Sequence, residues 1–153
     1  MTTTYSKEEK IIIGDADGLI ALISNDDIHH EVAYKLMVHF YETGYRVFFP
    51  ATAIAETLTT LTRVLGNKEA EYNIVGQIAE GPLKMVDTTK EILKLAALRF
   101  YNPKSSKKDT FFDAIVAATA FSHGAKYIYS FDSYYQKVGF RLTKELLQTR
   151  VDV

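Results

Sequence analysis

The chain has 153 residues, of which 47% are hydrophobic and 24% are charged, and its formal net charge is −1 at pH 7. This length and composition predict one globular domain that spans residues 1–153 and buries a sizeable core. The sequence has no cysteine, which excludes disulfides, cysteine-based zinc sites and thiol nucleophiles and fits a reducing, cytoplasmic location. Its near-neutral charge gives no sign of bulk nucleic-acid binding, and a local basic edge is compatible with it.

The sequence also gives no sign of a membrane segment or a secretion signal. Residues 1–10 are polar and lack the apolar core of a signal peptide. No stretch approaches the apolar length that a membrane-spanning helix needs. We therefore expect no membrane association.

The first expected element is a buried strand that leads into two carboxylates. Residues 11–13 are three isoleucines, a short β-branched run that is typical of a strand in a parallel sheet. Asp15 and Asp17 follow, and an apolar helical stretch begins at Gly18. Because open α/β sheets bind ligands at the carboxyl ends of their strands, both acids lie where a site is expected. The two acids repel one another, and a bound Mg²⁺ ion would offset that cost.

The rest of the chain alternates helical and strand patterns. We expect helices at residues 28–43, 51–65, 68–80, 89–101 and 109–123, and strands at residues 46–50, 83–86 and 126–131. Asp87 or Thr88 would cap the helix at 89–101, and Asp109 would cap the helix at 109–123. Residues 137–140 and the tail that follows fit either a short strand or a frayed helix. Strands that alternate with helices predict an α/β fold with a parallel sheet covered on both faces.

Four carboxylates are expected to meet at one edge of this sheet. Asp15 and Asp132 each follow an apolar strand, and parallel strands end at the same edge. Asp113 lies in an apolar, alanine-rich helix, and Glu56 lies among apolar residues in another helix. The set predicts a pocket for one or two Mg²⁺ or Mn²⁺ ions, which favour carboxylate and water ligands. Such a site suits phosphodiester hydrolysis, because a bound metal lowers the pKa of water and stabilises charge on the attacking and leaving oxygens.

Each of these acids also has a purely structural interpretation. Asp15 could be a turn residue or a helix N-cap, and Asp17 could either touch a metal or water or cap the helix that follows. Glu56 alone could be an exposed helix residue, and Asp132 alone could be a strand-end turn residue. The combination of the acids, rather than any single one, favours a functional site.

Three features beside these acids have more than one interpretation. Asp109 lies four residues before Asp113 and could be the metal ligand in its place. The loop at residues 104–108 carries three lysines that could steer phosphates, although solvated loop lysines are the commoner case. Tyr134 and Tyr135 could stack on a nucleic-acid base, but packing in the core is favoured.

The pattern as a whole resembles the PIN-domain ribonucleases, including the VapC-type toxins of toxin–antitoxin pairs. The segments that carry the resemblance occur in the family's order and are DADGLIAL at 15–22, PATAIAE at 50–56, DAIVAATA at 113–120 and YSFDSYY at 129–135. They extend over almost the whole chain, roughly from Ile11 to Phe140. The four segments in order make the resemblance specific.

The resemblance implies a three-layer α/β/α sandwich with a central parallel sheet and an acidic site for Mg²⁺ or Mn²⁺. It also implies endonucleolytic cleavage of RNA, commonly by a homodimer, and an antitoxin partner if the protein is a toxin. Carried over by position, Asp15 and Asp113 would be the primary metal ligands, while Glu56 and Asp132 would ligate or orient waters. The chain departs from the pattern at Asp17, where a small hydroxyl residue is common, and this extra charge bears on metal affinity.

Two other functions remain open from the sequence. A haloacid-dehalogenase-type phosphatase also ends its first strand in an Asp-x-Asp-Gly motif, with the first Asp as nucleophile, as residues 15–18 would allow. Leu19 stands where that family usually has Thr or Val, and Glu56 and Asp113 would have no role. The second alternative is a non-catalytic RNA-binding protein of the PIN-like fold, and the presence of all four acids speaks against it.

Overall fold

The computed structural model of the chain describes residues 10–105 and 108–148. In these stretches, parallel strands form one five-stranded sheet in the order β3-β2-β1-β4-β5. The strands are β1 (Ile11–Gly14), β2 (Arg46–Pro50), β3 (Met85–Val86), β4 (Tyr127–Tyr129) and β5 (Arg141–Leu142). The predicted parallel α/β fold is therefore confirmed.

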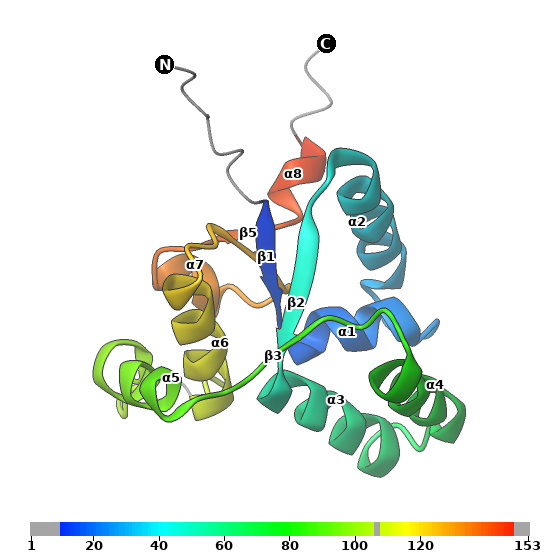
Figure 1. Cartoon of the computed structure of the whole chain (residues 1–153), viewed down its shortest axis with the longest axis horizontal. Helices are drawn as coiled ribbons and strands as arrows, with labels where there is room; N and C mark the ends of the chain where they lie inside the picture. Colours follow the sequence, from blue (N-terminus) through cyan, green and yellow to red (C-terminus); the bar gives the residue numbers. More distant parts are fainter. Residues whose placement is uncertain (1–9, 106–107, 149–153) are drawn as a thin grey trace, which may run out of the picture.

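Helices cover both faces of this sheet, which Figure 1 shows nearly edge-on. One layer holds α1 (Ala16–Ile23), α2 (His30–Thr43), α3 (Ala51–Arg63) and α4 (Lys68–Glu80). The other holds α5 (Lys90–Leu95), its π-helical continuation η1 (Ala96–Phe100), α6 (Phe111–Ser122) and α7 (Tyr134–Lys137), and α8 (Glu145–Gln148) is a short helix at the end of the described chain. Within the described residues, no helix is long and apolar enough to cross a membrane.

The isoleucine run of β1 is apolar throughout because both of its faces are covered. Ile12 packs into the cluster formed with α1 to α4, whereas Ile13 packs into the cluster formed with α5, η1, α6 and α7. Successive side chains of a strand point to opposite faces of the sheet, so one strand feeds both cores. Burying each isoleucine contributes about 1.5–3 kcal/mol to folding.

Two helix caps differ from the prediction. Thr89, rather than Asp87 or Thr88, caps α5 through its side chain. Thr110 is the N-cap of α6, so Asp109 lies just outside that helix and its predicted capping role is wrong. In both cases several candidate caps stand side by side in the sequence, and spacing alone does not choose among them.

The strand expected at residues 126–131 is shorter than predicted and ends at Tyr129. Ser130 and Phe131 leave the sheet because their polar groups bind Asp17 instead of a neighbouring strand. The part of the tail that the structure describes, up to residue 148, contains both predicted forms, with the short helices α7 and α8 on either side of β5, and residues 149–153 lie outside it.

The strand order places the carboxyl ends of β1 and β4 side by side. From β1 the chain builds the sheet outward through β2 and β3, and it then returns to add β4 and β5 on the other side of β1. The point at which the order reverses is the usual ligand site of an open α/β sheet. Asp15 follows β1 and Asp132 lies three residues after the end of β4, so both acids flank this switch point.

Candidate metal centre

Asp15 is fixed by three hydrogen bonds where β1 passes into α1. Its backbone N–H donates to the Tyr129 carbonyl at 3.0 Å, which extends the pairing of β1 with β4 by one residue. Its Oδ1 accepts from the N–H of Ala16 at 2.7 Å, so Asp15 is the N-cap of α1. Its Oδ2 accepts from the hydroxyl of Tyr135 at 2.6 Å. Asp15 therefore combines the capping role with a buried position at the sheet edge, where it is only 4% exposed.

Asp17 ties the start of α1 to the segment that follows β4. Its Oδ2 accepts from Ser130 Oγ at 2.9 Å and from the N–H of Phe131 at 2.8 Å. It does not cap the helix, because Asp15 holds that position. Its Oδ1 is buried, and no donor among the described residues reaches it. Asp17 thus has a structural oxygen and an unsatisfied one.

Gly18 allows the start of α1 to pack closely against Tyr129 in β4. A Cβ atom at this position would lie 2.6 Å from the Tyr129 carbonyl oxygen and 2.9 Å from the ring of the same residue. The obstacle includes backbone, which cannot move aside cheaply. The glycine in the Asp-Ala-Asp-Gly sequence is therefore required by helix–strand packing.

Three aspartates from α6 and the segments beside it form a compact acidic cluster. A carboxylate oxygen from each of Asp109, Asp113 and Asp132 lies within 4.8 Å of the other two. Asp113 Oδ2 accepts from the N–H of Thr110 at 2.8 Å, and Asp132 Oδ1 accepts from the N–H of Tyr134 at 2.9 Å. Sequence reasoning treated Asp109 as a cap or as a substitute for Asp113, but the structure brings both acids together. Their spacing of four residues was the signal that could have included Asp109 in the predicted set.

Glu56 reaches the acids from α3, on the other side of β1 from α6. Its side chain is partly buried, and its Oε2 has no hydrogen-bond partner among the described residues. Burial raises the pKa of Glu56, and the charges of Asp113 and Asp17 raise it further. The structure thus places Glu56 in the electrostatic field of the cluster, rather than on an open helix surface.

The carboxylates disfavour one another's ionised forms. Burial is the main reason that the pKa of Asp113 rises to about 6, and the charges of Asp132, Asp109 and Asp17 add to it, whereas the Thr110 N–H lowers it. Burial raises the pKa of Asp15 well above its usual value, and the charge of Asp17 contributes. Such convergence of raised pKa values in one place is typical of functional sites.

The donor set fits a hard divalent cation. Every candidate ligand is a carboxylate oxygen, and Mg²⁺ and Mn²⁺ prefer oxygen ligands. Glu56 Oε2 and Asp17 Oδ1 are buried acceptors without donors in the described part of the chain, although buried polar groups normally have partners. A cation would satisfy such oxygens and offset the mutual repulsion of the acids.

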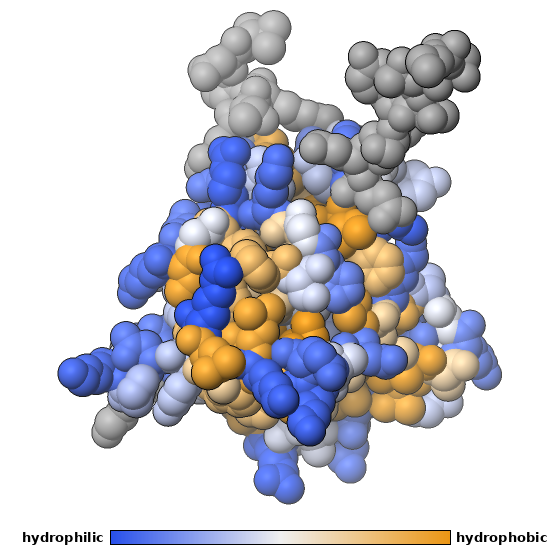
Figure 2. All heavy atoms as spheres, turned by 60° about the vertical axis from the view of Figure 1, so that its left-hand side comes forward, coloured by the Kyte–Doolittle hydropathy of each residue, from blue (hydrophilic) through white to orange (hydrophobic). Residues whose placement is uncertain are grey.

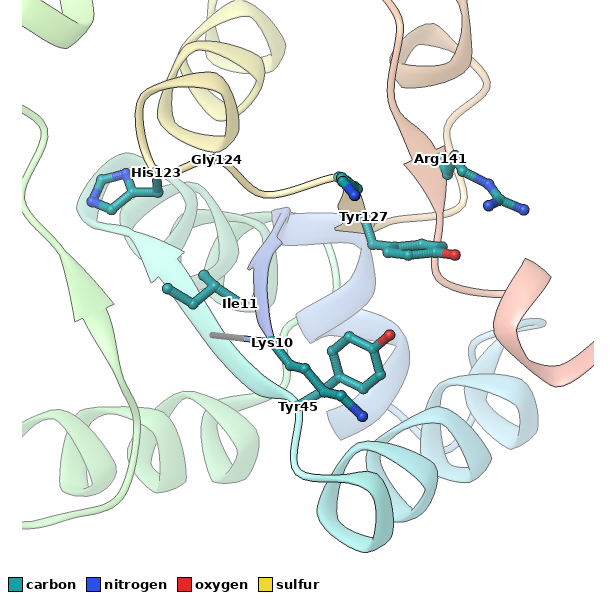
Figure 3. Close-up of a pocket in the computed structure, with 8 residues that line it drawn as sticks. Lys10, Ile11, Tyr45, His123, Gly124, Tyr127 and Arg141 are labelled. Atoms are coloured by element: carbon teal, nitrogen blue, oxygen red, sulfur yellow. The ribbon is translucent and has the colours of Figure 1, made fainter. Parts of the chain in front are cut away.

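A separate cavity of about 550 Å³ lies at the opposite, amino-terminal edge of the sheet (Figure 3). Lys10 Nζ donates to the carbonyl of Thr43, at the end of α2, at 3.1 Å. His123 Nδ1 lies 2.8 Å from the Thr119 carbonyl near the end of α6, and Arg141 pairs with Glu145. A cation beside a helix carboxyl end stabilises the helix, which accounts for Lys10, and Arg141 is engaged by Glu145. The cavity is lined by Lys10, Ile11, Tyr45, His123, Gly124, Lys126, Tyr127 and Arg141.

Comparisons with known proteins agree with this architecture. The sequence profile of the PIN domain matches residues 12–141. No curated protein sequence matches the chain. VapC20 of Mycobacterium tuberculosis, described as a sarcin-ricin loop cleaving toxin, aligns with a TM-score of 0.71 and 21% identity over 84% of this chain and 95% of that one.

Two further structures share the fold. PAE2754 of Pyrobaculum aerophilum aligns with a TM-score of 0.57 and 17% identity over 93% of this chain and 96% of that one. FitAcB of Neisseria gonorrhoeae aligns with a TM-score of 0.58 and 16% identity over 86% of this chain and 95% of that one. The phosphatase alternative is set aside, since one profile accounts for the chain from the first strand to the last. The protein belongs to the PIN domain family and shares the fold of the VapC-type toxin VapC20.

Proposed function

We propose that this protein is a metal-dependent endoribonuclease that hydrolyses RNA phosphodiester bonds. The observation that carries the proposal is the convergence of buried and half-buried carboxylates at the switch point of the sheet. They come from four separate parts of the chain, and burial together with neighbouring acidic charges raises the pKa values of Asp15, Glu56 and Asp113. The site residues of the proposal are Asp15, Glu56, Asp113 and Asp132, with Asp109 beside them.

The proposed roles follow from the position and hydrogen bonds of each acid. Asp15 and Asp113 would hold Mg²⁺ or Mn²⁺, since both are buried and their carboxylates are fixed by protein donors. Glu56 and Asp132 would complete the binding or orient water. When bound, the ion supplies charge stabilisation at the phosphate and lowers the pKa of a water molecule. No nucleophilic side chain is needed, and the cysteine-free chain offers no thiol.

A cleavage assay tests this function. The protein is stripped with EDTA and mixed with a labelled RNA, and Mg²⁺ or Mn²⁺ is then added back. We expect cleavage only with metal, and its loss in Asp15→Asn and Asp113→Asn. Asp26→Asn, an exposed acid in the loop after α1, is the control and should cut normally. RNA that is bound but not cut under any of these conditions would favour the non-catalytic alternative.

The lysine loop before α6 is proposed as a phosphate contact. Lys104 and Lys108 are exposed, while Lys107 lies outside the described residues. The loop adjoins Asp109, which belongs to the acidic cluster, so a phosphate chain that enters the site would pass near it. Replacing Lys107 and Lys108 with Ala should weaken RNA binding and flatten its salt dependence. Unchanged affinity across a salt series would contradict this contact.

We also propose that the protein is the toxin of a toxin–antitoxin pair and acts in the cytoplasm. Its fold is that of VapC20, which is described as a toxin. An antitoxin would bind over the acidic pocket and could place a basic residue in it. Co-expression with the product of a small neighbouring open reading frame should yield a complex that no longer cuts RNA. A neighbouring gene product that neither binds nor inhibits would leave a nuclease without this partner.

A homodimer is the assembly that we propose. Figure 2 shows apolar side chains gathered on the face that carries α5 and α6. Exposed apolar residues there include Leu98, which is 88% exposed, together with Leu93, Tyr101, Phe111, Phe112 and Phe121. Large exposed apolar patches commonly mark interfaces between proteins. Sedimentation velocity should give the mass of a dimer, and Leu98→Glu should shift it to a monomer if this face is the interface.

A further inference from the structure

A buried tyrosine from the far end of the chain holds the first acid of the site. Tyr135 lies in the short helix α7, just after Asp132, and is fully buried. Its hydroxyl donates to Asp15 Oδ2 at 2.6 Å, across 120 residues of sequence. A hydroxyl bond to a carboxylate at this distance belongs to the short, charge-assisted class.

The two hydrogen bonds to Asp15 fix its carboxylate from both sides. Oδ1 accepts from the N–H of Ala16, and Oδ2 accepts from Tyr135. An ionised carboxylate offers about four acceptor positions, so each oxygen keeps a lone pair for a further partner. Without the hydroxyl, the bond to Ala16 alone would leave Oδ2 without its donor and the carboxylate less well oriented.

We propose that Tyr135 is a positioning residue whose hydroxyl orients the Asp15 carboxylate for binding of the divalent cation. This inference rests on the proposed metal-dependent function. Partners that orient a metal ligand commonly change metal affinity 10- to 100-fold when they are removed. The prediction therefore concerns metal affinity directly, and it can be measured without RNA.

The adjacent residue provides a matched control. Tyr134 lies in the same helix, is 6% exposed and packs against Tyr135 with ring centroids 5.2 Å apart. Its hydroxyl donates to the carbonyl of Phe100 at 3.0 Å, instead of to an acid. Tyr134→Phe and Tyr135→Phe each remove one buried hydroxyl from α7, but only the second removes a bond to a proposed metal ligand.

The test is a titration of Mn²⁺ followed by the electron paramagnetic resonance signal of the free ion, with full-length wild type and both variants. We expect Tyr135→Phe to raise the Mn²⁺ dissociation constant by about 10- to 100-fold. Tyr134→Phe should leave it within about twofold of wild type, even if both variants lower the thermal unfolding temperature. The rise in thermal unfolding temperature on adding Mn²⁺ is a second measurement on the same variants, and it should be smaller for Tyr135→Phe than for wild type and Tyr134→Phe.

The outcomes separate this inference from the function on which it rests. Equal Mn²⁺ affinity in wild type and Tyr135→Phe would overturn the role of Tyr135 and leave the metal site intact. Equal losses in Tyr134→Phe and Tyr135→Phe would also overturn it, because they would show a general effect of disturbing α7. Wild type that binds no Mn²⁺ at all would overturn the metal site and the positioning role together.

Discussion

The Ser130 hydroxyl donates to the Asp17 carboxylate at 2.9 Å, although the two residues are 113 positions apart in the sequence. The N–H of Phe131 donates to the same oxygen, so Asp17 fastens the end of β4 to the start of α1. This fastening brings the segment that carries Asp132 beside Asp15. The sequence left the role of Asp17 open. One of its oxygens has a structural role, because it joins the segment after β4 to the start of α1.

The structural role of these two hydrogen bonds can be tested by comparing two substitutions of Asp17. Asp17→Ala removes both hydrogen bonds and should lower the free energy of unfolding by about 1.5–3 kcal/mol. Asp17→Asn keeps a carbonyl oxygen that can accept from Ser130 and Phe131. It also removes a carboxylate whose charged form is disfavoured by burial, which raises the pKa of Asp17. It should therefore cost less than the alanine variant. Urea unfolding of both variants measures the difference, and equal losses would show that the two hydrogen bonds contribute nothing.

Gly18 should be intolerant of a methyl group for reasons of packing. Gly18→Ala would push α1 away from the Tyr129 carbonyl, which also accepts the Asp15 N–H. We expect a loss of about 1–3 kcal/mol in unfolding free energy. Gly76→Ala is the control, because that glycine lies within α4 and its new Cβ would meet nothing within 4 Å. It should raise stability by about 0.5–1 kcal/mol. If both variants were stabilised, the close approach of α1 to β4 would be wrong.

Asp113 should make the metal-free protein less stable as the pH rises. Its pKa is about 6 in the folded state, above the ordinary value of 3.8, mainly because it is buried. Between about pH 4 and pH 6 the folded state therefore holds more protons than the unfolded state. In EDTA, Asp113 should contribute a fall in stability of up to about 3 kcal/mol through this window, and the other acids with raised pKa values should add to the fall.

Asp113→Asn should remove the part of that slope that Asp113 contributes, which thermal unfolding of wild type and variant across pH 4–8 would measure. Binding of Mn²⁺ should show the opposite dependence, since the cation needs the ionised carboxylate, and should weaken below about pH 6. A wild-type stability curve that matches Asp113→Asn at every pH would contradict the assignment.

The predictable parts of this protein are those fixed by local pattern and sheet topology. The isoleucine run identified β1, and the rule that parallel strands end at one edge placed Asp15 and Asp132 together. The limits of α4 follow from Asn67, whose side chain caps the helix, and from Gly81 at its other end. Such signals lie within a few residues of the element that they define.

The remaining features depend on contacts between distant parts of the chain. Nothing local shows that Tyr135 bonds Asp15, or that Asp17 receives donors from beyond β4. Asp109 was predicted to cap α6, but Thr110 beside it is an equally good cap, and only the fold shows which residue is used. The single-domain assignment over residues 1–153 stays a prediction.

The central claim is that the carboxylates at the switch point hold a divalent cation. Anomalous scattering at the manganese edge, from crystals of wild-type protein grown with Mn²⁺, tests it most directly. The account predicts an anomalous peak within direct bonding distance of carboxylate oxygens of Asp15 and Asp113, and no peak there in Asp113→Asn crystals. Fully occupied Mn²⁺ elsewhere on the protein, with no peak among these acids, would contradict it.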